Sequence, residues 1–388
     1  MTDPGPLRLA YLADPIETHT HRWLRWFAAR GHRVDLVVPY DAKDDGSLPE
    51  GINLIRLPEF GGRSIRPLGY LDARAALRKV FAELDPDVVH AHYLTGYGWL
   101  AWVSGFRPYA ITVWGSDVFR TIPASRKARW FGRLSLRGAA LVTADSKDLA
   151  EASIRAGARR ERTDIIQFGV ETTRFAPAPP NAELRRRLGI PDGRLVFSPR
   201  ILMSWNRHDL VVRALRELPA DVRLLFSARH ADPAVRASLV ALAEELGLGG
   251  RIHFVEDIPH DEMADHLRLA DVIVSIPETD GTPVTILESL ACGVPVVASD
   301  VPSVVEWLSV VTPELLVPIG DGAATTRTIR AALELDPARR AEMAAAGRRL
   351  VVEQGDHDTN MRAVEDHYRR LAGSRSRARS GRPARVAD

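Results

Sequence analysis

The sequence predicts an α/β protein of two domains, each with a parallel β-sheet between layers of helices. Three observations indicate this. Short apolar runs alternate with longer stretches of helical periodicity, a rhythm typical of βαβ units. A segment rich in Pro and Arg, residues 171–193, interrupts the rhythm, which then resumes. The length of 388 residues suits two or three domains.

The apolar runs of the first half are its expected strands. They cover residues 7–13, 32–39, 52–57, 87–92, 109–114, 140–146 and 165–170. Helical patterns lie between most of them, as in THRWLRWFAARG, where Gly31 is a helix-stop signal. Strands that are apolar throughout and alternate with helices form parallel sheets buried on both faces.

The second half repeats the pattern. Its expected strands cover residues 194–200, 222–229, 251–256, 271–277 and 294–300. We therefore expect an N-terminal domain over 1–173 and a C-terminal domain over 174–355, followed by a helix over 356–372. The last stretch, 373–388, is basic and lacks apolar periodicity, so we expect it to be disordered.

Composition excludes several classes of protein. A net charge of +2 does not favour a polyanion as partner of the whole chain, so no nucleic acid is expected. A lone cysteine, Cys292, rules out an internal disulfide and favours a reducing cytoplasm. No apolar run approaches the ~18 residues of a membrane helix. Neither half opens with G-x-G-x-x-G after its first strand, which disfavours dinucleotide redox chemistry.

The segment 278–300, ETDGTPVTILESLACGVPVVASD, combines a tight turn with a short apolar helix. Thr282 is suited to cap that helix and Pro283 to its first position. Gly281 lets the backbone approach a ligand closely. The free N–H groups of a first helical turn, together with the helix dipole, form an anion site suited to phosphate.

Two carboxylates flank this turn. Glu288 interrupts an apolar stretch, and a carboxylate there needs hydrogen-bond donors such as the hydroxyls of a ribose. Asp280, on the loop before the helix, is placed for hydroxyls of a group beyond the phosphate. A sugar nucleotide presents that order of ribose, phosphates and sugar. The alternative interpretation is a capped helix with a solvated Glu.

The segment resembles the C-terminal donor-binding motif of family 4 retaining glycosyltransferases of the GT-B fold: acid, seven residues, Glu, then A-C-G-x-P-V-V. The resemblance covers about residues 7–371 and implies two Rossmann-like domains facing across a cleft, with the last helix crossing back to the N-terminal domain. It implies that Asp280 positions the donor hexose. The loop amides at Gly281 to Val284 then hold phosphate or hexose, and Glu288 holds the ribose.

Two arginines of the second domain, Arg200 and Arg207, belong at the carboxyl end of its sheet, where ligands of α/β proteins bind. They are candidates to stabilise a departing diphosphate, or are surface residues at a helix end. The family has Arg, then Lys-Gly about five residues later, whereas this chain has Asn206-Arg207. The resemblance also implies that main-chain groups near Asp257 and Ile258 hold the base, where a carboxylate would favour guanine.

The first domain offers four candidates for acceptor binding. His19 lies in the loop after the first strand, and His92 ends another strand at the same sheet edge. The H-x-H patterns that contain these two histidines also suggest a metal site. We favour hydrogen bonding to a sugar over metal binding as their role. In ITVWGSDVF, Trp114 stands where the family often has His, and it either stacks on a sugar or fills core. Asp117 either binds acceptor or caps the next helix.

We therefore predict a cytoplasmic glycosyltransferase that moves a sugar from a nucleotide diphosphate, UDP before GDP, to an acceptor with retention of configuration. The acceptor is a small molecule, a glycan or a lipid-linked group. The resemblance implies independence of metals and other cofactors. The alternatives are a GT-B nucleotide-sugar epimerase and a non-catalytic nucleotide-sugar-binding protein.

One basic segment raises a separate question. Residues 120–134 read RTIPASRKARWFGRL, with five cations beside Trp130 and Phe131. A solvated helix face is the favoured interpretation. The alternative is a basic amphipathic helix at a membrane surface, which would make the protein peripheral to the inner face of the membrane.

Overall fold

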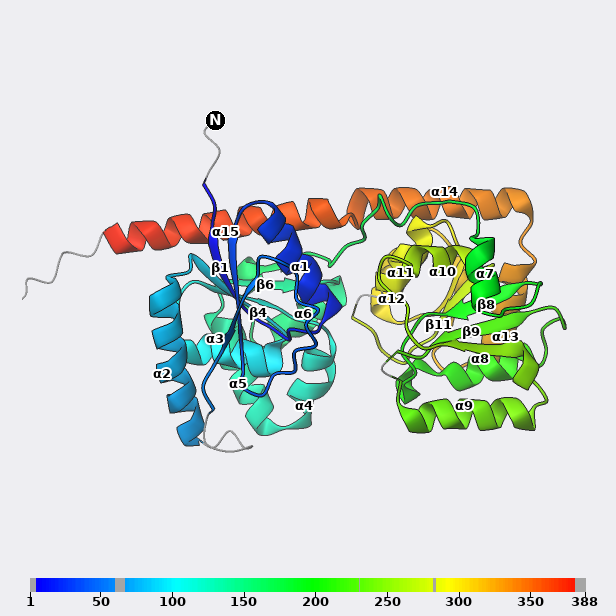
Figure 1. The fold of residues 1–388 in the computed structure, drawn as a ribbon, viewed down its shortest axis with the longest axis horizontal. Helices are drawn as coiled ribbons and strands as arrows, with labels where there is room; N and C mark the ends of the chain where they lie inside the picture. The colour runs from blue at the N-terminus through cyan, green and yellow to red at the C-terminus, as the bar shows by residue number, and fades with distance from the viewer. Residues whose placement is uncertain (1–4, 60–66, 230, 282–283, 381–388) are drawn as a thin grey trace, which may run out of the picture. The chain divides into compact units, whose positions relative to one another are not determined.

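A computed structural model describes residues 5–59, 67–229, 231–281 and 284–380. The chain divides into two compact units (Figure 1). The first contains the residues up to Gln167 together with those from Thr359 onward, and the second spans Phe168–Asp358. The chain therefore passes between the units twice, at 167–168 and at 358–359.

The first unit is built on a parallel sheet of seven strands in the order β3-β2-β1-β4-β5-β6-β7 (Figure 1). The strands are β1 (Arg8–Leu12), β2 (Arg33–Val38), β3 (Asn53–Arg56), β4 (Val88–His92), β5 (Tyr109–Thr112), β6 (Leu141–Ala144) and β7 (Thr163–Ile165). Six of them coincide with predicted strands. The apolar run 165–170 contributes only Ile165 to β7. Ile166, Phe168 and Val170 are buried beyond the end of the strand, and Val170 forms an isolated parallel bridge with Asp356.

Helices cover both faces of this sheet. They are α1 (Thr18–Ala29), α2 (Pro67–Leu84), α3 (Trp99–Ser104), α4 (Ile122–Ala124), α5 (Arg126–Gly138), α6 (Lys147–Ala156) and the first unit's part of α15 (His357–Ser380), with single turns η1 (Leu94–Gly98), η2 (Asp117–Thr121) and η3 (Arg160–Arg162). One core lies under α2, α3, α5 and α6, with Leu77, Ala101, Leu136 and Leu149 packed on the strands. On the other face, Phe27 of α1 and Tyr368 of α15 pack on each other with ring centroids 5.2 Å apart.

A buried chain of hydrogen bonds ties α15 to the sheet. The hydroxyl of Tyr368 lies 3.1 Å from that of Tyr11 and also bonds to His90 Nδ1. His90 Nε2 lies 2.8 Å from the hydroxyl of Thr112 on the next strand, which in turn bonds to Thr143 at 2.6 Å. This chain of hydrogen bonds runs across four adjacent strands, β1, β4, β5 and β6, and connects them to the last helix.

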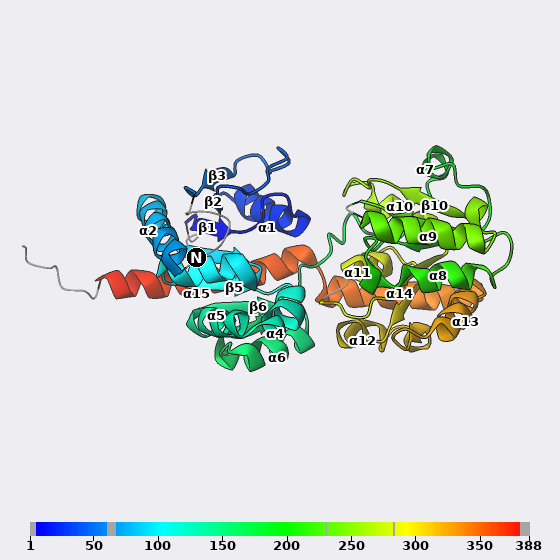
Figure 2. The same ribbon diagram turned by 90° about the horizontal axis from the view of Figure 1, so that it is seen from below.

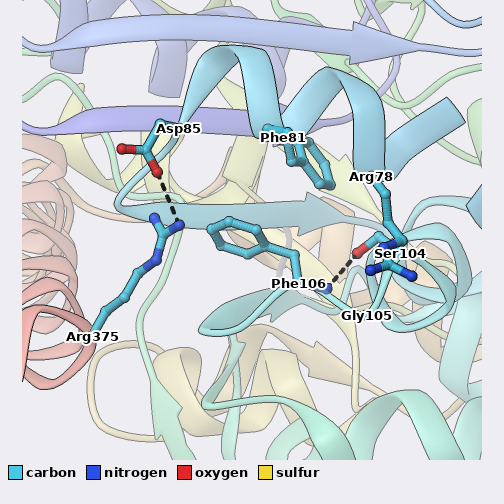
Figure 3. Close-up of a pocket in the computed structure, with 8 residues that line it drawn as sticks. Arg78, Phe81, Asp85, Ser104, Gly105, Phe106 and Arg375 are labelled. Atoms are coloured by element: carbon cyan, nitrogen blue, oxygen red, sulfur yellow. Dashed lines mark hydrogen bonds and ion pairs between the residues drawn. The ribbon is translucent and has the colours of Figure 1, made fainter. Parts of the chain in front are cut away.

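The expected disorder from residue 373 is wrong for the described part of that stretch, since α15 continues to Ser380. Arg375 is the physical reason. Its guanidinium lies 4.4 Å from the centre of the Phe106 ring, and its Nη2 lies 3.2 Å from Asp85 Oδ1. Figure 3 shows these groups around a cavity of about 520 Å³, which Arg78 and Phe81 of α2 also line. Residues 381–388 lie outside the described chain.

The second unit has a parallel sheet of six strands in the order β10-β9-β8-β11-β12-β13. The strands are β8 (Leu195–Ser198), β9 (Arg223–Ser227), β10 (Ile252–Val255), β11 (Val272–Ser275), β12 (Val296–Ser299) and β13 (Leu316–Val317). The first five coincide with predicted strands. The sixth has only two residues, too few for the pattern of apolar residues to identify.

Helices again form two layers (Figures 1 and 2). They are α7 (Ala182–Arg187), α8 (His208–Leu215), α9 (Pro233–Glu245), α10 (Met263–Leu269), α11 (Val284–Ala291), α12 (Pro302–Leu308), α13 (Gly322–Leu333) and α14 (Pro337–Gln354), with single turns η4 (Ser204–Asn206), η5 (Gly249–Arg251) and η6 (Pro313–Leu315). Helices α8, α9 and α13 share one core, which contains Val211, Leu239 and Ile329. Helices α10, α11, α12 and α14 share the other. Within the described residues, no helix is both long and apolar enough to cross a bilayer.

Candidate functional site

Two loops at the carboxyl ends of neighbouring strands meet in the second unit. One follows β8 and the other follows β11, and the two strands are paired. The backbone N–H of Glu278 donates to the carbonyl of Trp205 at 2.8 Å, which joins the loops. Beside this joint, Arg200 Nη1 lies 3.0 Å from Asp280 Oδ2, with the two side chains 21% and 10% exposed. Two residues proposed for catalysis from different motifs are thus an ion pair.

Buried polar groups hold the arginine loop in place. His208 Nε2 lies 3.0 Å from the carbonyl of Ile201, and its Nδ1 lies 3.2 Å from the hydroxyl of Ser198. Asn206 Nδ2 donates to the same carbonyl at 2.8 Å. Burial lowers the pKa of His208 to about 4, so the imidazole is neutral at pH 7. The loop's shape therefore rests on neutral hydrogen bonds beneath Arg200.

Arg207 is placed differently from Arg200. It precedes α8 with a left-handed backbone, φ 50° and ψ 39°. Its Nε lies 3.2 Å from Asp209 Oδ1, and its Nη1 lies 3.5 Å from Glu278 Oε1. These partners, Asp209 first, raise the pKa of Arg207. Its guanidinium therefore faces one carboxylate in the first turn of α8 and one on the loop after β11.

The apolar helix α11 begins at Val284, which is buried, as is Gly281 in the loop before it. The predicted cap and first position, Thr282 and Pro283, lie outside the described residues. Glu288 is 5% exposed, which fits the expectation that a carboxylate in this apolar stretch is not simply solvated. One turn earlier, the hydroxyl oxygen of Thr285 is buried and has no hydrogen-bond partner among the residues that the structure describes, a feature that the sequence alone did not single out as a site.

The two residues expected to hold the base differ in exposure: one is an exposed acid and the other a buried apolar residue. Asp257 is 63% exposed and lies 3.4 Å from Arg229 Nε, while Ile258 is buried. The neighbouring Glu256 forms a bidentate pair with Arg236. Because both carboxylates already have arginine partners, they offer less support for recognition of guanine N–H groups.

In the first unit, three of the predicted acceptor residues come together at the carboxyl ends of the strands. The ring of Trp114 lies 5.8 Å from that of His19 and 6.1 Å from that of His92. His92 and Trp114 line a cavity of about 450 Å³. The sequence did not single out Asp14 and Tyr97, which also line it, although each lies just past the carboxyl end of a strand.

His92 is the unusual member of this group. It is 1% exposed, and neither ring nitrogen has a hydrogen-bond partner in the described part of the chain. Burial lowers its pKa to about 3, so the ring is neutral at pH 7. A buried polar group without a partner is costly, and a ligand hydroxyl reaching His92 from the cavity would remove that cost. His90, two residues earlier and so on the same face of β4, already has both partners in the chain to α15.

The sequence allows two roles for Asp117, acceptor binding or a helix cap, and its position does not fit direct contact with an acceptor. It is fully buried. Its carboxylate accepts backbone N–H groups from Leu94 at 2.7 Å, from Gly115 at 3.0 Å and from Val118 at 3.0 Å, as well as from Trp114. Burial raises its pKa, and the backbone hydrogen bonds oppose that rise. Its observed role is to fix the loops after β4 and β5, and so to position Trp114.

Comparisons with known proteins cover most of the chain. Residues 8–146 match the family described as glycosyl transferase 4-like, and residues 181–350 match glycosyl transferases group 1. The chain is 30% identical over 328 residues to 2-deoxystreptamine N-acetyl-D-glucosaminyltransferase of Streptomyces fradiae, covering 80% of this chain and 76% of that one. It is 29% identical over 318 residues to D-inositol 3-phosphate glycosyltransferase of Xylanimonas cellulosilytica, covering 77% and 74%.

Solved structures share the architecture at low identity. Sucrose-phosphate synthase from Thermosynechococcus elongatus has a TM-score of 0.79 and 22% identity, over 95% of this chain and all of that one. Anabaena HepE, solved in complex with UDP and glucose, has a TM-score of 0.78 and 19% identity, over 94% of this chain and all of that one.

Proposed function

This chain belongs to the family 4 type of glycosyltransferases and has the GT-B fold, and from that premise we propose how its two units divide the reaction. The second unit binds a nucleotide-diphosphate sugar, and UDP is favoured over GDP as the nucleotide. The first unit binds the acceptor. The sugar is transferred with retention of its anomeric configuration, and the reaction needs neither a metal nor another cofactor.

The observation that carries this proposal is the ion pair of Arg200 and Asp280 beside the start of α11. A guanidinium has five N–H donors, so Arg200 can keep its ion pair with Asp280 and still donate to a diphosphate. Asp280 then positions Arg200 and accepts from hydroxyls of the hexose. Glu288 accepts from the ribose, and Gly281 with Val284 lines the phosphate loop of which Thr282 and Pro283 are expected members.

The chemical step requires little from the protein beyond charge and orientation. The bond from the anomeric carbon to the phosphate oxygen breaks, and a bond from that carbon to the acceptor oxygen forms on the same face. The proton of the acceptor hydroxyl passes to the departing diphosphate. Arg200, with Arg207 as a second candidate, stabilises the negative charge that develops on the diphosphate.

The preference for UDP rests on the base position. Asp257 and Glu256 are paired with arginines, so main-chain groups at Asp257 and Ile258 are the better candidates to contact the base. The UDP bound in the structure of Anabaena HepE is consistent with this choice.

The cavity of the first unit supports the binding of a hydroxyl-rich acceptor. His92 offers a neutral ring with free nitrogens, Trp114 offers an apolar face for a sugar or cyclitol ring, and His19 lies beside it. Two carboxylates, Asp14 and Glu17, also line the cavity, and its described lining contains no Arg or Lys. This favours a neutral or amine-bearing ring over a phosphate at this position, and so an acceptor closer to 2-deoxystreptamine than to inositol 3-phosphate.

A thermal-shift panel of UDP, GDP, dTDP and ADP tests the donor site. A ligand present at 100 times its Kd stabilises the folded state by about 2.7 kcal/mol, and we expect UDP to give the largest shift. Glu288→Gln should reduce the shift with UDP, whereas Asp257→Asn should not. Stabilisation by GDP alone would contradict the choice of base, and the absence of any shift would contradict the donor site.

Incubation with nucleotide sugars then tests transfer. With a cell extract, mass spectrometry should detect a glycosylated acceptor, and His92→Phe should reduce the yield while leaving the UDP shift unchanged. Conversion of the donor to an isomer without extract would identify an epimerase. Binding without turnover under either condition would identify a binding protein.

A further inference from the structure

A long basic segment of the first unit lies apart from the proposed substrate sites. From Val118 to Ala144 the sequence contains no Asp or Glu. Six cations fall in that stretch, Arg120, Arg126, Lys127, Arg129, Arg133 and Arg137, most of them on α5. Figure 2 shows α4, α5 and α6 together along one side of the first unit.

Helix α5 is held in a single orientation by its inner face. Ala128, Gly132, Ser135 and Leu136 are buried against the core. A Cβ at Gly132 would lie 2.2 Å from Ile122 Cδ1, so this turn of the helix touches α4. The hydroxyl of Ser125 caps the helix, accepting from Ala128 N at 3.0 Å.

The outer face of α5 is therefore fixed, and it is basic with one large aromatic ring. Arg126, Trp130, Arg133 and Arg137 are spaced by four, three and four residues, which places them along one stripe of a helix. All four are exposed, and Lys127 is exposed next to them. We call these five residues the α5 stripe.

Within the described ranges of the chain, the charges of this stripe have no acidic partner. None of its four cations forms an ion pair with any residue that the structure describes. The neighbouring Arg129 uses one N–H to bond the carbonyl of Pro123 at 2.9 Å, which is a neutral partner. A surface of several unpaired cations attracts a polyanionic or anionic surface by long-range electrostatics.

Trp130 is held outward by other aromatic rings. Its side chain is 57% exposed. Its ring centre lies 6.3 Å from that of Trp102 and 4.9 Å from that of Phe131, both in edge-on contacts. Phe131 in turn packs on Trp99 at 5.4 Å. An indole fixed on the surface amid cations has the amphipathic character that is favoured at the boundary between lipid headgroups and acyl chains.

We propose that the α5 stripe docks the enzyme reversibly on an anionic lipid bilayer. The cations contact lipid phosphates, and Trp130 enters the headgroup region. Because the apolar face of α5 is used inside the unit, the helix lies on the bilayer and does not insert deeply. The stripe begins shortly after the loop that follows β5, whose carboxyl end carries Trp114, so an enzyme bound this way holds its proposed acceptor cavity close to the membrane.

Vesicle sedimentation with the full chain tests this proposal. The probes are vesicles of phosphatidylcholine with 30% phosphatidylglycerol and vesicles of phosphatidylcholine alone. Binding is expected only to the anionic vesicles and should weaken as salt rises from about 50 to 500 mM. A triple variant, Arg126→Gln with Lys127→Gln and Arg133→Gln, should lower the partition coefficient about a hundredfold, from about 1 kcal/mol for each cation.

A matched variant controls for net charge. Arg213, Arg216 and Arg327 of the second unit are exposed and outside the ion pairs. Replacing these three by Gln changes the charge by the same amount and should leave vesicle binding unchanged. Trp130→Ser should weaken vesicle binding severalfold without changing retention on a soluble acidic polysaccharide.

Three outcomes overturn the proposal. They are failure of the wild-type chain to bind anionic vesicles, equal binding to neutral vesicles, and equal losses in the two triple variants. In the first of these cases, retention on the soluble polysaccharide would indicate a polyanionic partner instead. None of these substitutions touches the proposed donor or acceptor residues, so the nucleotide shifts should persist throughout.

Discussion

Replacing Arg200 by alanine tests the proposed mechanism at its centre. The substitution removes the guanidinium whose Nη1 lies 3.0 Å from Asp280 Oδ2 and leaves a carboxylate that is 10% exposed. Exposed ion pairs contribute up to about 1 kcal/mol, and loss of one partner of a buried pair costs about 3–5 kcal/mol. With one side chain 21% exposed and the other 10%, we expect the free energy of unfolding to fall by about 2 kcal/mol.

The two consequences of this change differ in size. In a domain of roughly 200 residues, 2 kcal/mol lowers Tm by about 4–8 °C. From a starting stability of at least about 5 kcal/mol, more than about 99% of the protein stays folded at 25 °C. Loss of a donor to a developing negative charge costs about 100–1000-fold in kcat. Unfolding therefore cannot account for the expected loss of turnover.

The assay measures kcat and Tm of wild type, Arg200→Ala, Arg200→Lys and Arg213→Ala with the donor selected by the nucleotide panel. Arg200→Lys keeps the charge but not the forked geometry, so its kcat should be intermediate. Arg213→Ala, an exposed position on α8, should match wild type in both quantities. A folded Arg200→Ala protein with kcat within about threefold of wild type would remove Arg200 from the mechanism.

Three further predictions concern protons, the last helix and metals. Burial lowers the pKa values of the His92 and His208 imidazoles to about 3 and 4 in the folded protein. In the unfolded chain both imidazoles have pKa values near 6.5. The unfolded state therefore binds more protons on acidification, and each group should lower the free energy of unfolding by about 2 kcal/mol at pH 5. Urea unfolding at pH 7.5 and 5.0 measures this, and equal midpoints at the two pH values would contradict it. Tyr368→Phe should lower the free energy of unfolding by about 1–3 kcal/mol, since Tyr11 and His90 lose a buried partner; an unchanged urea midpoint would contradict that role. Dialysis against EDTA should leave kcat unchanged, and restoration of a lost activity by a divalent cation would refute the metal-free mechanism.

Most of the fold could be predicted because strands buried on both faces leave a clear apolar pattern. The exceptions have physical reasons. The run 165–170 is apolar because it is buried where the chain leaves the first unit, and β13 is too short to register. The end of α15 was mistaken for disorder because the contacts of Arg375 come from residues almost 300 positions away.

The candidate site could be predicted in part. Arg200 and Asp280 lie 80 positions apart, and their convergence follows from the rule that ligands bind at the carboxyl ends of parallel strands. Burial of Asp117 could not be read from its sequence, because an acid before a helix looks the same whether it caps the helix or binds a ligand. Asp14 and Tyr97 could have been found by the same strand-end rule that selected His92.

The last helix carries a consequence for synthesis. Residues from Thr359 onward complete the first unit through Tyr368 and Arg375, and they leave the ribosome after the whole of the second unit. The second unit can finish folding while the first unit is still incomplete, because the surface around Tyr11 and His90 is not yet covered by the last helix. Folding of the first-made half during synthesis is therefore completed only after the whole second unit has been translated, and a truncation within the last helix would damage the part of the enzyme translated first.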